Sequence, residues 1–417
     1  MKFSFLIPSK NRLELLAHAV ESILRQDYKN FEIIISDNAS EQDYAGFIKK
    51  IGDDRIIYSR SSMPVSVTQN WNNALKLASG DYILMLGDDD ALTPNFLPRV
   101  FDLLSEMGQP DILYFASYHY CYPDVIPSAP KGYLANVRNS EFFKGKDTPF
   151  RLSHDQAQRA AKAIFDIRYL FGFNSQHFLF RAGFLDEISA SSIGSIFQSP
   201  YPDTFASAVS FLKAKSIVVI PYPMVIIGIS PKSFGYYYFN NLSAEGSEFL
   251  DNELVSPEVR DTLNAFVLPG SSNNTNWLVA AEVARQALSP EFDLTVNIDR
   301  YRTLQIVAFL RDIYINKVRK LDQIEQFSQK LSQSENLSLN IILIAIDIVG
   351  ESQVKEIFDD LDKRLGQFCP SEINMVEIGQ HSSVVDAFNW LTKQSEPIVI
   401  ARRSLIRRCL RRIFTWE

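Results

Sequence analysis

Short apolar runs in the first ninety residues alternate with amphipathic stretches. The runs lie at 2–9, 30–37, 55–61 and 81–86 and are rich in Ile, Leu, Phe and Tyr. Between and after them, apolar positions recur at helical spacing and predict helices over 12–26, 44–51, 67–79 and 93–107. Thr93 and Pro94 are expected to begin the last of these helices. Nearly continuous apolar runs are typical of strands buried on both faces, so the pattern predicts a parallel sheet covered by helices.

Polar clusters follow three of these strands, at the point where each strand ends. They read PSKNR (8–12), SDNAS (36–40) and GDDDA (87–91). The carboxyl ends of parallel strands meet at one edge of a sheet, where ligands bind, so we expect the clusters to line one crevice. Neither GxGxxG nor GxxxxGK[ST] follows any of these strands, which removes the main support for a dinucleotide-binding or P-loop domain.

Acidic residues dominate this crevice, namely Asp37, Asp88 and Asp89. Adjacent carboxylates repel one another unless a cation or hydrogen-bond donors compensate them. Carboxylate oxygens are the ligands that Mg²⁺ and Mn²⁺ prefer. The sequence therefore predicts a divalent cation that bridges the protein to a nucleoside diphosphate or triphosphate. The alternative is that these acids only form solvated turns.

The composition is that of an ordinary globular protein, with 46% hydrophobic and 22% charged residues. At 417 residues the chain is expected to form two or three domains. Its net charge of −7 argues against nucleic-acid binding. Three scattered cysteines without CxxC spacing indicate a reducing compartment and no zinc site. No apolar run is long enough for a signal-peptide core or a membrane span, so a cytoplasmic protein is expected.

Four segments together resemble the family-2 glycosyltransferases of GT-A fold. They are FLIPSKNR (5–12), IIISDNASEQD (33–43), NWNNALKLASGDYILMLGDDD (70–90) and YPDTFASAVSFLKAKSIVVIPYP (201–223). The resemblance covers roughly residues 1–235. It implies a Rossmann-like α/β domain that binds a nucleotide-diphospho-sugar, a UDP-sugar in the first place, together with Mn²⁺ or Mg²⁺. It further implies an inverting transfer of the sugar to a hydroxyl of a glycan, lipid-linked or protein-linked acceptor.

The resemblance also implies roles for residues around the donor nucleotide. Pro8 and Ser9 would line the base pocket through their backbone, and Asp37 would hydrogen-bond the nucleobase. Asn72, in the helix before the acidic strand, would help to shape the nucleotide site.

The acidic cluster carries the remaining donor-site roles. In the family the motif reads Asp-x-Asp, and here Gly87 replaces its first acid. The resemblance then implies that Asp88 faces the ribose and that Asp89 is the principal metal ligand under the diphosphate, whereas Asp90 is expected either to cap a helix or to support the other two acids.

Asp203 stands where the family's acidic pair supplies the catalytic base, and Pro202 replaces the first acid of that pair. A base there would deprotonate the acceptor hydroxyl as it attacks the anomeric carbon. The alternative is an acid that is merely stabilised by the helix dipole. Two further residues have open roles: His177 either lines the acceptor side or is structural, and Lys232 either contacts phosphate or lies in a surface turn.

The predicted domains are a GT-A catalytic domain over 1–240, a helical extension over 241–335, and a small α/β accessory region over 336–417. A long amphipathic helix is expected over 298–333, and two strands around Pro221 and Pro223. The tail 402–417 holds six Arg and one Glu, whereas the rest of the chain carries a net charge of −12. This basic tail is predicted either to contact the inner face of a membrane peripherally or to dock on the acidic remainder of the protein.

The leading hypothesis is thus a metal-dependent inverting glycosyltransferase. A nucleotidyltransferase shares the sheet and the acids, but PSKNR lacks the glycines of its usual loop. The second hypothesis is a non-catalytic nucleotide- or sugar-binding subunit on a degenerate glycosyltransferase fold, because Gly87 and Pro202 replace two acids.

Overall fold

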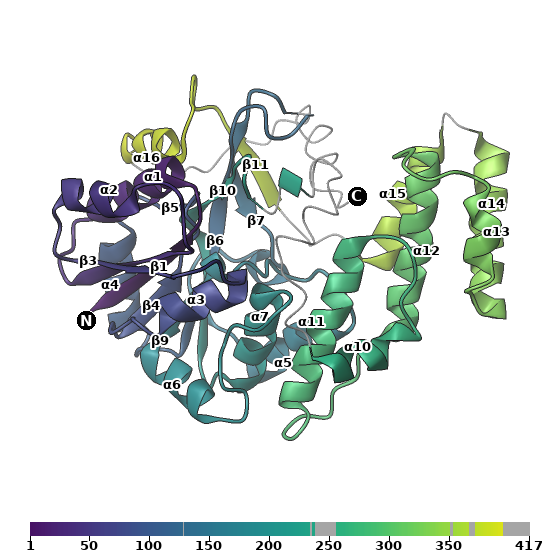
Figure 1. Ribbon diagram of the computed structural model, residues 1–417, viewed down its shortest axis with the longest axis horizontal. Helices are drawn as coiled ribbons and strands as arrows, with labels where there is room; N and C mark the ends of the chain where they lie inside the picture. Colours follow the sequence, from purple (N-terminus) through teal and green to yellow (C-terminus); the bar gives the residue numbers. More distant parts are fainter. Residues whose placement is uncertain (128, 234–235, 238–255, 351–352, 367–371, 395–417) are drawn as a thin grey trace.

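A mixed β-sheet forms the centre of the molecule, and helices cover both of its faces (Figure 1). The computed structural model describes residues 1–417 except 128, 234–235, 238–255, 351–352, 367–371 and 395–417. Along its main path the sheet has the strand order β11-β7-β6-β9-β4-β1-β2-β3, and β10 pairs with β5, β6 and β8. The predicted α/β class is confirmed.

The strands are β1 (Phe3–Ser9), β2 (Phe31–Asp37), β3 (Ile56–Arg60), β4 (Tyr82–Met85), β5 (Ala91–Leu92), β6 (Ile112–Cys121), β7 (Tyr133–Arg138), β8 (Phe150–Arg151), β9 (Phe178–Arg181), β10 (Ile217–Ile229) and β11 (Glu372–Val376). The helices of the first 230 residues are α1 (Leu13–Leu24), α2 (Tyr44–Ile51), α3 (Val67–Leu75), α4 (Phe96–Glu106), α5 (His154–Phe165), α6 (Ala182–Ala190) and α7 (Pro202–Lys213), with short 3-10 turns η1 (Glu141–Phe143) and η2 (Ser175–His177).

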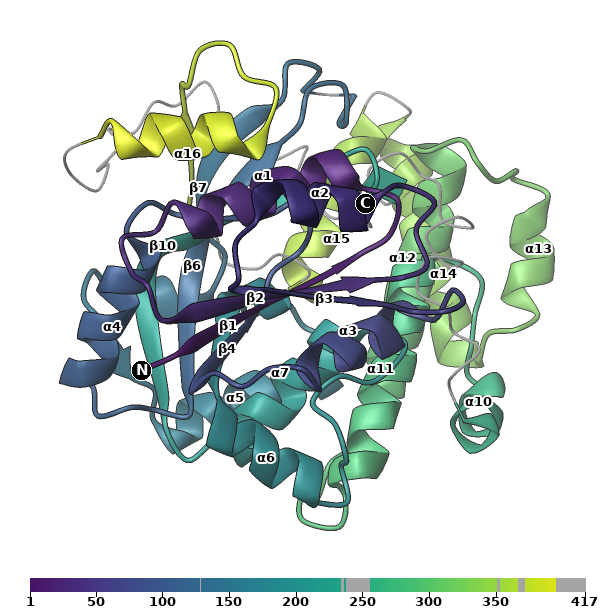
Figure 2. The same ribbon diagram turned by 60° about the vertical axis from the view of Figure 1, so that its left-hand side comes forward.

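The first four strands are parallel to one another, as predicted. β1 lies between β2 and β4, and β3 pairs with β2. Consecutive residues of β1 face opposite sides: Phe5 packs in a core with Leu16 of α1, and Leu6 packs in a core with Val209 of α7. Both faces of the strand are therefore apolar, which explains the unbroken hydrophobic runs of the sequence. Figure 2 shows α1 and α2 on one side of these strands and α3 and α7 on the other.

Beyond β4 the sheet is no longer all parallel. β9 is antiparallel to both β4 and β6, and β7 is antiparallel to β6. The prediction of two strands around Pro221 and Pro223 was wrong, because one long strand, β10, runs parallel to β6 with register shifts on both sides of Pro223. A proline donates no ladder hydrogen bond, so an irregularity at this point lets the strand continue.

The helix after the acidic cluster begins later than predicted. α4 starts at Phe96 after Asn95, whose φ is 59°. Thr93 does not cap it, because its backbone N–H and its Oγ1 both donate to the Met224 carbonyl of β10, at 3.1 and 2.8 Å. The residues after the acids thus pair with β10, and this pairing holds the acidic turn against that strand.

The C-terminal part contains α10 (Pro257–Asn264), α11 (Ser272–Leu288), α12 (Ile298–Tyr314), α13 (Gln323–Ser328), α14 (Gln333–Val349), α15 (Val354–Leu365) and α16 (Val384–Thr392). The single long helix expected over 298–333 was wrong, because α12 ends at Tyr314 and α13 begins at Gln323. α11 packs into the core beneath the sheet, where the Trp277 indole donates to the Ile164 carbonyl at 3.0 Å. A further core, separate from those on the two faces of the sheet, joins α12, α13, α14 and α15.

The region predicted as a separate accessory unit also contributes to the central sheet. β11 pairs antiparallel with β7, from Glu372 opposite Arg138 to Val376 opposite Leu134. α16 then packs beside α1, where Phe388 lies under the Arg25 guanidinium at 4.6 Å. The basic tail 402–417 lies outside the described residues. Among the residues that are described, no helix is long and apolar enough to cross a membrane.

Candidate active site

The three acids that follow β4 are buried. Asp88, Asp89 and Asp90 are 2%, 6% and 1% exposed. Every residue of β4 is buried as well. The acids that follow this strand therefore lie in the interior, at the edge of the sheet where the parallel strands β1 and β2 also end. The interpretation as a solvated turn is therefore wrong. Because buried carboxylates destabilise a fold unless they are compensated, the partners of each acid indicate what it does.

Asp88 is held by the polar turn that follows β1. The Ser9 hydroxyl donates to its Oδ2 at 2.6 Å, and Arg12 Nη1 donates to its Oδ1 at 3.0 Å. Burial lowers the pKa of Arg12, but the charges of Asp88 and Asp89 outweigh burial and raise it. The structure thus brings two of the three predicted polar clusters together through a buried ion pair.

Asp89 has less compensation than Asp88. The Ser230 hydroxyl, just after β10, donates to its Oδ2 at 2.6 Å. Burial and the adjacent Asp88 carboxylate raise the pKa of Asp89, although Arg12 and Ser230 oppose the rise. A buried carboxylate whose charge is only partly compensated is stabilised by a cation that binds next to it.

Asp90 is a structural acid that ties three segments together. It accepts hydrogen bonds from the backbone N–H groups of Gly87 and Gly228, at 2.7 and 2.8 Å, and from Gln176 Nε2 at 2.8 Å. A Cβ on Gly87 would lie 2.5 Å from Asp90 Oδ2. The carboxyl group of Asp90 therefore occupies the space that a side chain at position 87 needs.

Asp203 lies at the start of α7, next to Pro202. The Ser175 backbone N–H donates to its Oδ1 at 2.6 Å, and burial raises the pKa of Asp203 to about 6. A helix dipole alone would lower this pKa, so burial dominates here. The residue is nevertheless half-buried rather than fully buried.

The turn η2 connects this carboxylate to the acidic cluster. Ser175 bonds Asp203, and the next residue, Gln176, bonds Asp90. Gln176 was not predicted, because nothing in a local sequence pattern marks an amide whose partner is 86 residues away. Ser230 was not predicted either, although it follows a predicted strand.

Asp37 lies beside Ser9 in the register of β1 and β2. It is fully buried, and its two carboxylate oxygens accept from the Tyr58 hydroxyl at 2.7 Å and the Ser40 backbone N–H at 2.8 Å. Burial and the Asp37 carboxylate raise the pKa of Tyr58 to about 12. Pro8, one residue before Ser9, is half-buried at the same edge. The predicted base-binding residues therefore sit together.

Asn72 lies apart from these groups. It is on α3, where its Nδ2 donates to the Phe197 carbonyl at 3.1 Å and its Oδ1 accepts from the Ser195 hydroxyl at 2.5 Å. Asn72 thus anchors the loop that leads to α7 and Asp203.

Two hydrogen bonds join the turn that follows β1 to the turn that follows β10. Arg12 donates from Nη2 to the Lys232 carbonyl, and Lys232 Nζ donates to the Asn11 carbonyl at 2.7 Å. The two turns are therefore hydrogen-bonded to each other, and the Arg12 guanidinium also pairs with Asp88. His177, whose role the sequence left open, is structural, because it is fully buried and its Nδ1 lies 2.7 Å from the Phe115 carbonyl. Burial lowers the pKa of His177 to about 4.

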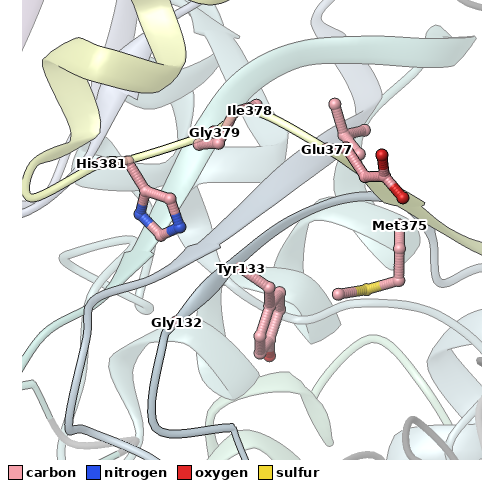
Figure 3. A pocket seen from close by; sticks show the side chains of 8 residues that line it. Gly132, Tyr133, Met375, Glu377, Ile378, Gly379 and His381 are labelled. Carbon is pink, nitrogen blue, oxygen red and sulfur yellow. The ribbon is translucent and has the colours of Figure 1, made fainter.

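A hollow of about 520 Å³ lies at the same edge of the sheet, beyond β6. Tyr133 begins β7 opposite Cys121, the last residue of β6, and residues 375–381 form the other wall. Figure 3 shows His381, Tyr133 and Met375 around this space. The Tyr120 hydroxyl lies 2.9 Å from His381 Nδ1, and the Tyr120 and Tyr122 rings are 4.8 Å apart. Burial raises the pKa of Tyr122, and the charge of Asp89 adds to the rise.

The residues present can supply part of the ligand shell of a divalent cation. Asp89 offers a hard oxygen ligand with an undercompensated charge. In the part of the chain that the structure describes, no group of three or more His, Cys, Asp or Glu side chains could hold a metal ion. A cation here would therefore take most of its ligands from a bound diphosphate and water, as Mg²⁺ commonly does.

Comparison with known proteins agrees with this geometry. Residues 4–162 match the family described as glycosyl transferase family 2. The chain is 36% identical over 108 residues to the GalNAc(5)-diNAcBac-PP-undecaprenol beta-1,3-glucosyltransferase of Campylobacter jejuni. It is 41% identical over 87 residues to the UDP-Glc:alpha-D-GlcNAc-diphosphoundecaprenol beta-1,3-glucosyltransferase WfaP of Escherichia coli. These alignments cover 25% and 21% of this chain and 35% of each relative.

Among solved structures, TarS 1–349 of S. aureus in complex with UDP-GlcNAc aligns with 92% of this chain and 99% of its own, at 14% identity and a TM-score of 0.46.

Proposed function

Residues 4–162 belong to glycosyl transferase family 2, and from this premise we propose that the chain transfers a sugar from a nucleotide-diphospho-sugar to an acceptor hydroxyl with inversion. One observation carries the proposal: η2 holds a carboxylate with a raised pKa, Asp203, in fixed relation to the buried acids that follow β4. The acids form one side of a reaction centre and Asp203 the other.

Asp203 is proposed as the general base. The acceptor oxygen bonds to the anomeric carbon while Asp203 takes its proton, and the bond from that carbon to the diphosphate breaks with the electron pair leaving on oxygen. A pKa near 6 leaves Asp203 ionised at neutral pH and still basic enough to take a proton. An acid on the face opposite the leaving group gives inversion.

Asp89 is proposed as the metal ligand and Asp88 as the group that faces the ribose. A bound Mn²⁺ or Mg²⁺ supplies charge neutralisation for the departing diphosphate. Arg12 orients Asp88 and compensates its charge through their ion pair. Pro8, Ser9 and Asp37 are proposed to line the nucleobase pocket, because they end two adjacent strands in register.

The donor is proposed to be a UDP-sugar and the acceptor a lipid-linked glycan, the substrates printed in the name of the E. coli relative. We assign the hollow at Tyr133 and His381 to the acceptor, since it lies at the same edge of the sheet as the acids. Tyr133 and Met375 supply apolar surface and His381 a polar edge, a combination suited to a sugar ring. His381→Ala is expected to raise the acceptor KM while donor hydrolysis stays unchanged. An unchanged acceptor KM would remove this assignment.

A panel of nucleotide-sugars tests the donor site. With Mn²⁺ present, one nucleoside diphosphate should raise the melting temperature, and EDTA or Asp89→Ala should abolish the rise. The matched control is Asp186→Ala, an exposed acid on α6 away from the acids after β4. If no nucleotide stabilises the protein, the transferase proposal is wrong.

A further inference from the structure

Helix α14 carries an apolar stripe on its outer face. Leu337, Ile341, Ile344 and Ile348 are 62%, 58%, 57% and 78% exposed. The opposite face is buried, because Leu339 and Ile346 pack in the core shared with α12 and α15. α14 lies at the outer margin of the molecule in Figure 1. A helix that is apolar on both faces is normally covered on both.

The spacing of the stripe indicates what covers it. The four residues follow one another at intervals of four, three and four, which is the seam spacing of a helix that pairs with another helix. Helices that lie on anionic lipid have a basic polar face, whereas residues 333–349 contain neither Lys nor Arg. Glu335, one of the two acids of α14, is already paired with Arg302 at 2.6 Å. The charge pattern therefore favours a protein partner.

We propose that this stripe is the contact between two copies of the chain, with their α14 helices antiparallel about a two-fold axis. In this arrangement Leu337 meets Ile348 of the second copy, and Ile341 meets Ile344. The pattern is then self-complementary, as a two-fold interface requires. Antiparallel pairing places Asp347 opposite the neutral Ser338 of the second copy, whereas parallel pairing would place the two Asp347 carboxylates together.

The contact is small, so the dimer is expected to be weak. Four aliphatic side chains per copy fall short of the roughly 800 Å² per partner of a standard interface. We therefore expect a dissociation constant on the order of micromolar. This inference is independent of the proposed activity.

Sedimentation equilibrium of the full chain over roughly 1 to 100 µM tests the dimer. The wild type should shift from monomer to dimer, and Ile344→Glu should remain monomeric with an unchanged circular dichroism spectrum. The matched control is Met63→Glu, which adds the same charge at a 66% exposed apolar side chain far from α14 in sequence. This control should dimerise like the wild type. A monomeric wild type, or an Ile344→Glu variant that dimerises normally, overturns the proposal.

Disulfide trapping tests the antiparallel register. In a background with Cys369→Ser and Cys409→Ser, a mixture of Ile341→Cys and Ile344→Cys chains should give a cross-linked heterodimer under mild oxidation. Leu337→Cys alone should not cross-link to itself. Self-cross-linking of Leu337→Cys overturns the antiparallel arrangement. Binding of the wild type to phosphatidylglycerol vesicles that Ile344→Glu abolishes would assign the stripe to lipid and overturn the proposal.

Discussion

Gln176 donates a hydrogen bond from Nε2 to Asp90 Oδ2 at 2.8 Å, across 86 residues of sequence. The residue before it, Ser175, donates its backbone N–H to Asp203 at 2.6 Å. A single turn therefore sets the position of the proposed base relative to the acids that follow β4. The geometry of the reaction centre depends on this turn as much as on the acids.

Replacing Gln176 by Leu should slow transfer while leaving donor binding intact. The variant removes one of the two donors to Asp90 Oδ2, leaves the Gly87 N–H in place and frees η2, so Asp203 loses its alignment with the acceptor. We expect kcat to fall about tenfold and the donor Kd to change less than about twofold. Steady-state kinetics with calorimetric donor titration measure both. A loss of donor binding equal to the loss of rate would instead indicate collapse of the acidic cluster.

Arg12→Ala should destabilise the fold strongly. Asp88, almost fully buried, would lose the cation that compensates it, and removal of one partner from a buried pair costs roughly 2–4 kcal/mol. Urea unfolding measures the change in the free energy of unfolding. Arg364→Ala is the matched control: its ion pair with Asp360 on α15 is exposed, and its loss should cost less than about 1 kcal/mol. Equal losses in the two variants would contradict the role given to Arg12.

Gly87→Ala should damage both stability and activity. Its Cβ would lie 2.5 Å from Asp90 Oδ2, and the Asp90 carboxylate cannot withdraw without breaking its hydrogen bonds, because Oδ2 accepts from Gln176 and Oδ1 accepts from Gly228. We expect a loss of roughly 1–3 kcal/mol in the free energy of unfolding. Gly183→Ala is the control, because its Cβ would meet the guanidinium of Arg181 at the same 2.5 Å, a flexible group that can move aside. Thermal unfolding of both variants measures the loss of stability in each, and the loss in Gly87→Ala should be the larger.

Asp203 should make the protein less stable as the pH rises. Its pKa is about 6 in the folded chain and about 3.9 in an unfolded one, so folding favours the protonated form. Its contribution to stability is then full below about pH 4 and is lost as the pH rises through about 6. Asp203→Asn should therefore be more stable than the wild type at pH 7.5 by roughly 2–3 kcal/mol, with little difference at pH 4. Chemical unfolding at both pH values tests this, and the exposed Asp186→Asn should show no such dependence.

Much of the fold and part of the site follow from local sequence. β1, β2 and β4 are predictable because both of their faces are buried, which leaves unbroken apolar runs. Asp88, Asp89 and Asp203 are recognisable because each stands at a strand or helix end within a family motif. The burial of the acids was not predictable, since it depends on donors from Ser9, Arg12 and Ser230, far apart in the chain.

The errors have a common physical origin in long-range pairing. Thr93 is of a residue type typical of helix N-caps, but its hydroxyl donates to the Met224 carbonyl of β10 instead, 131 residues away. β11 is only five residues long and becomes a strand because β7 offers it an edge. α14 is apolar on both faces, so its sequence has little helical periodicity to recognise.

The central claim is that Asp203 is the base of a sugar transfer. The most direct measurement is the rate of nucleoside diphosphate release with donor, Mn²⁺ and acceptor at pH 7.5, for the wild type and Asp203→Asn, with donor affinity measured on both. We predict a rate loss of roughly 10²–10⁴-fold in Asp203→Asn with donor affinity within about twofold of the wild type. A variant that retains more than about a tenth of the wild-type rate would contradict the account.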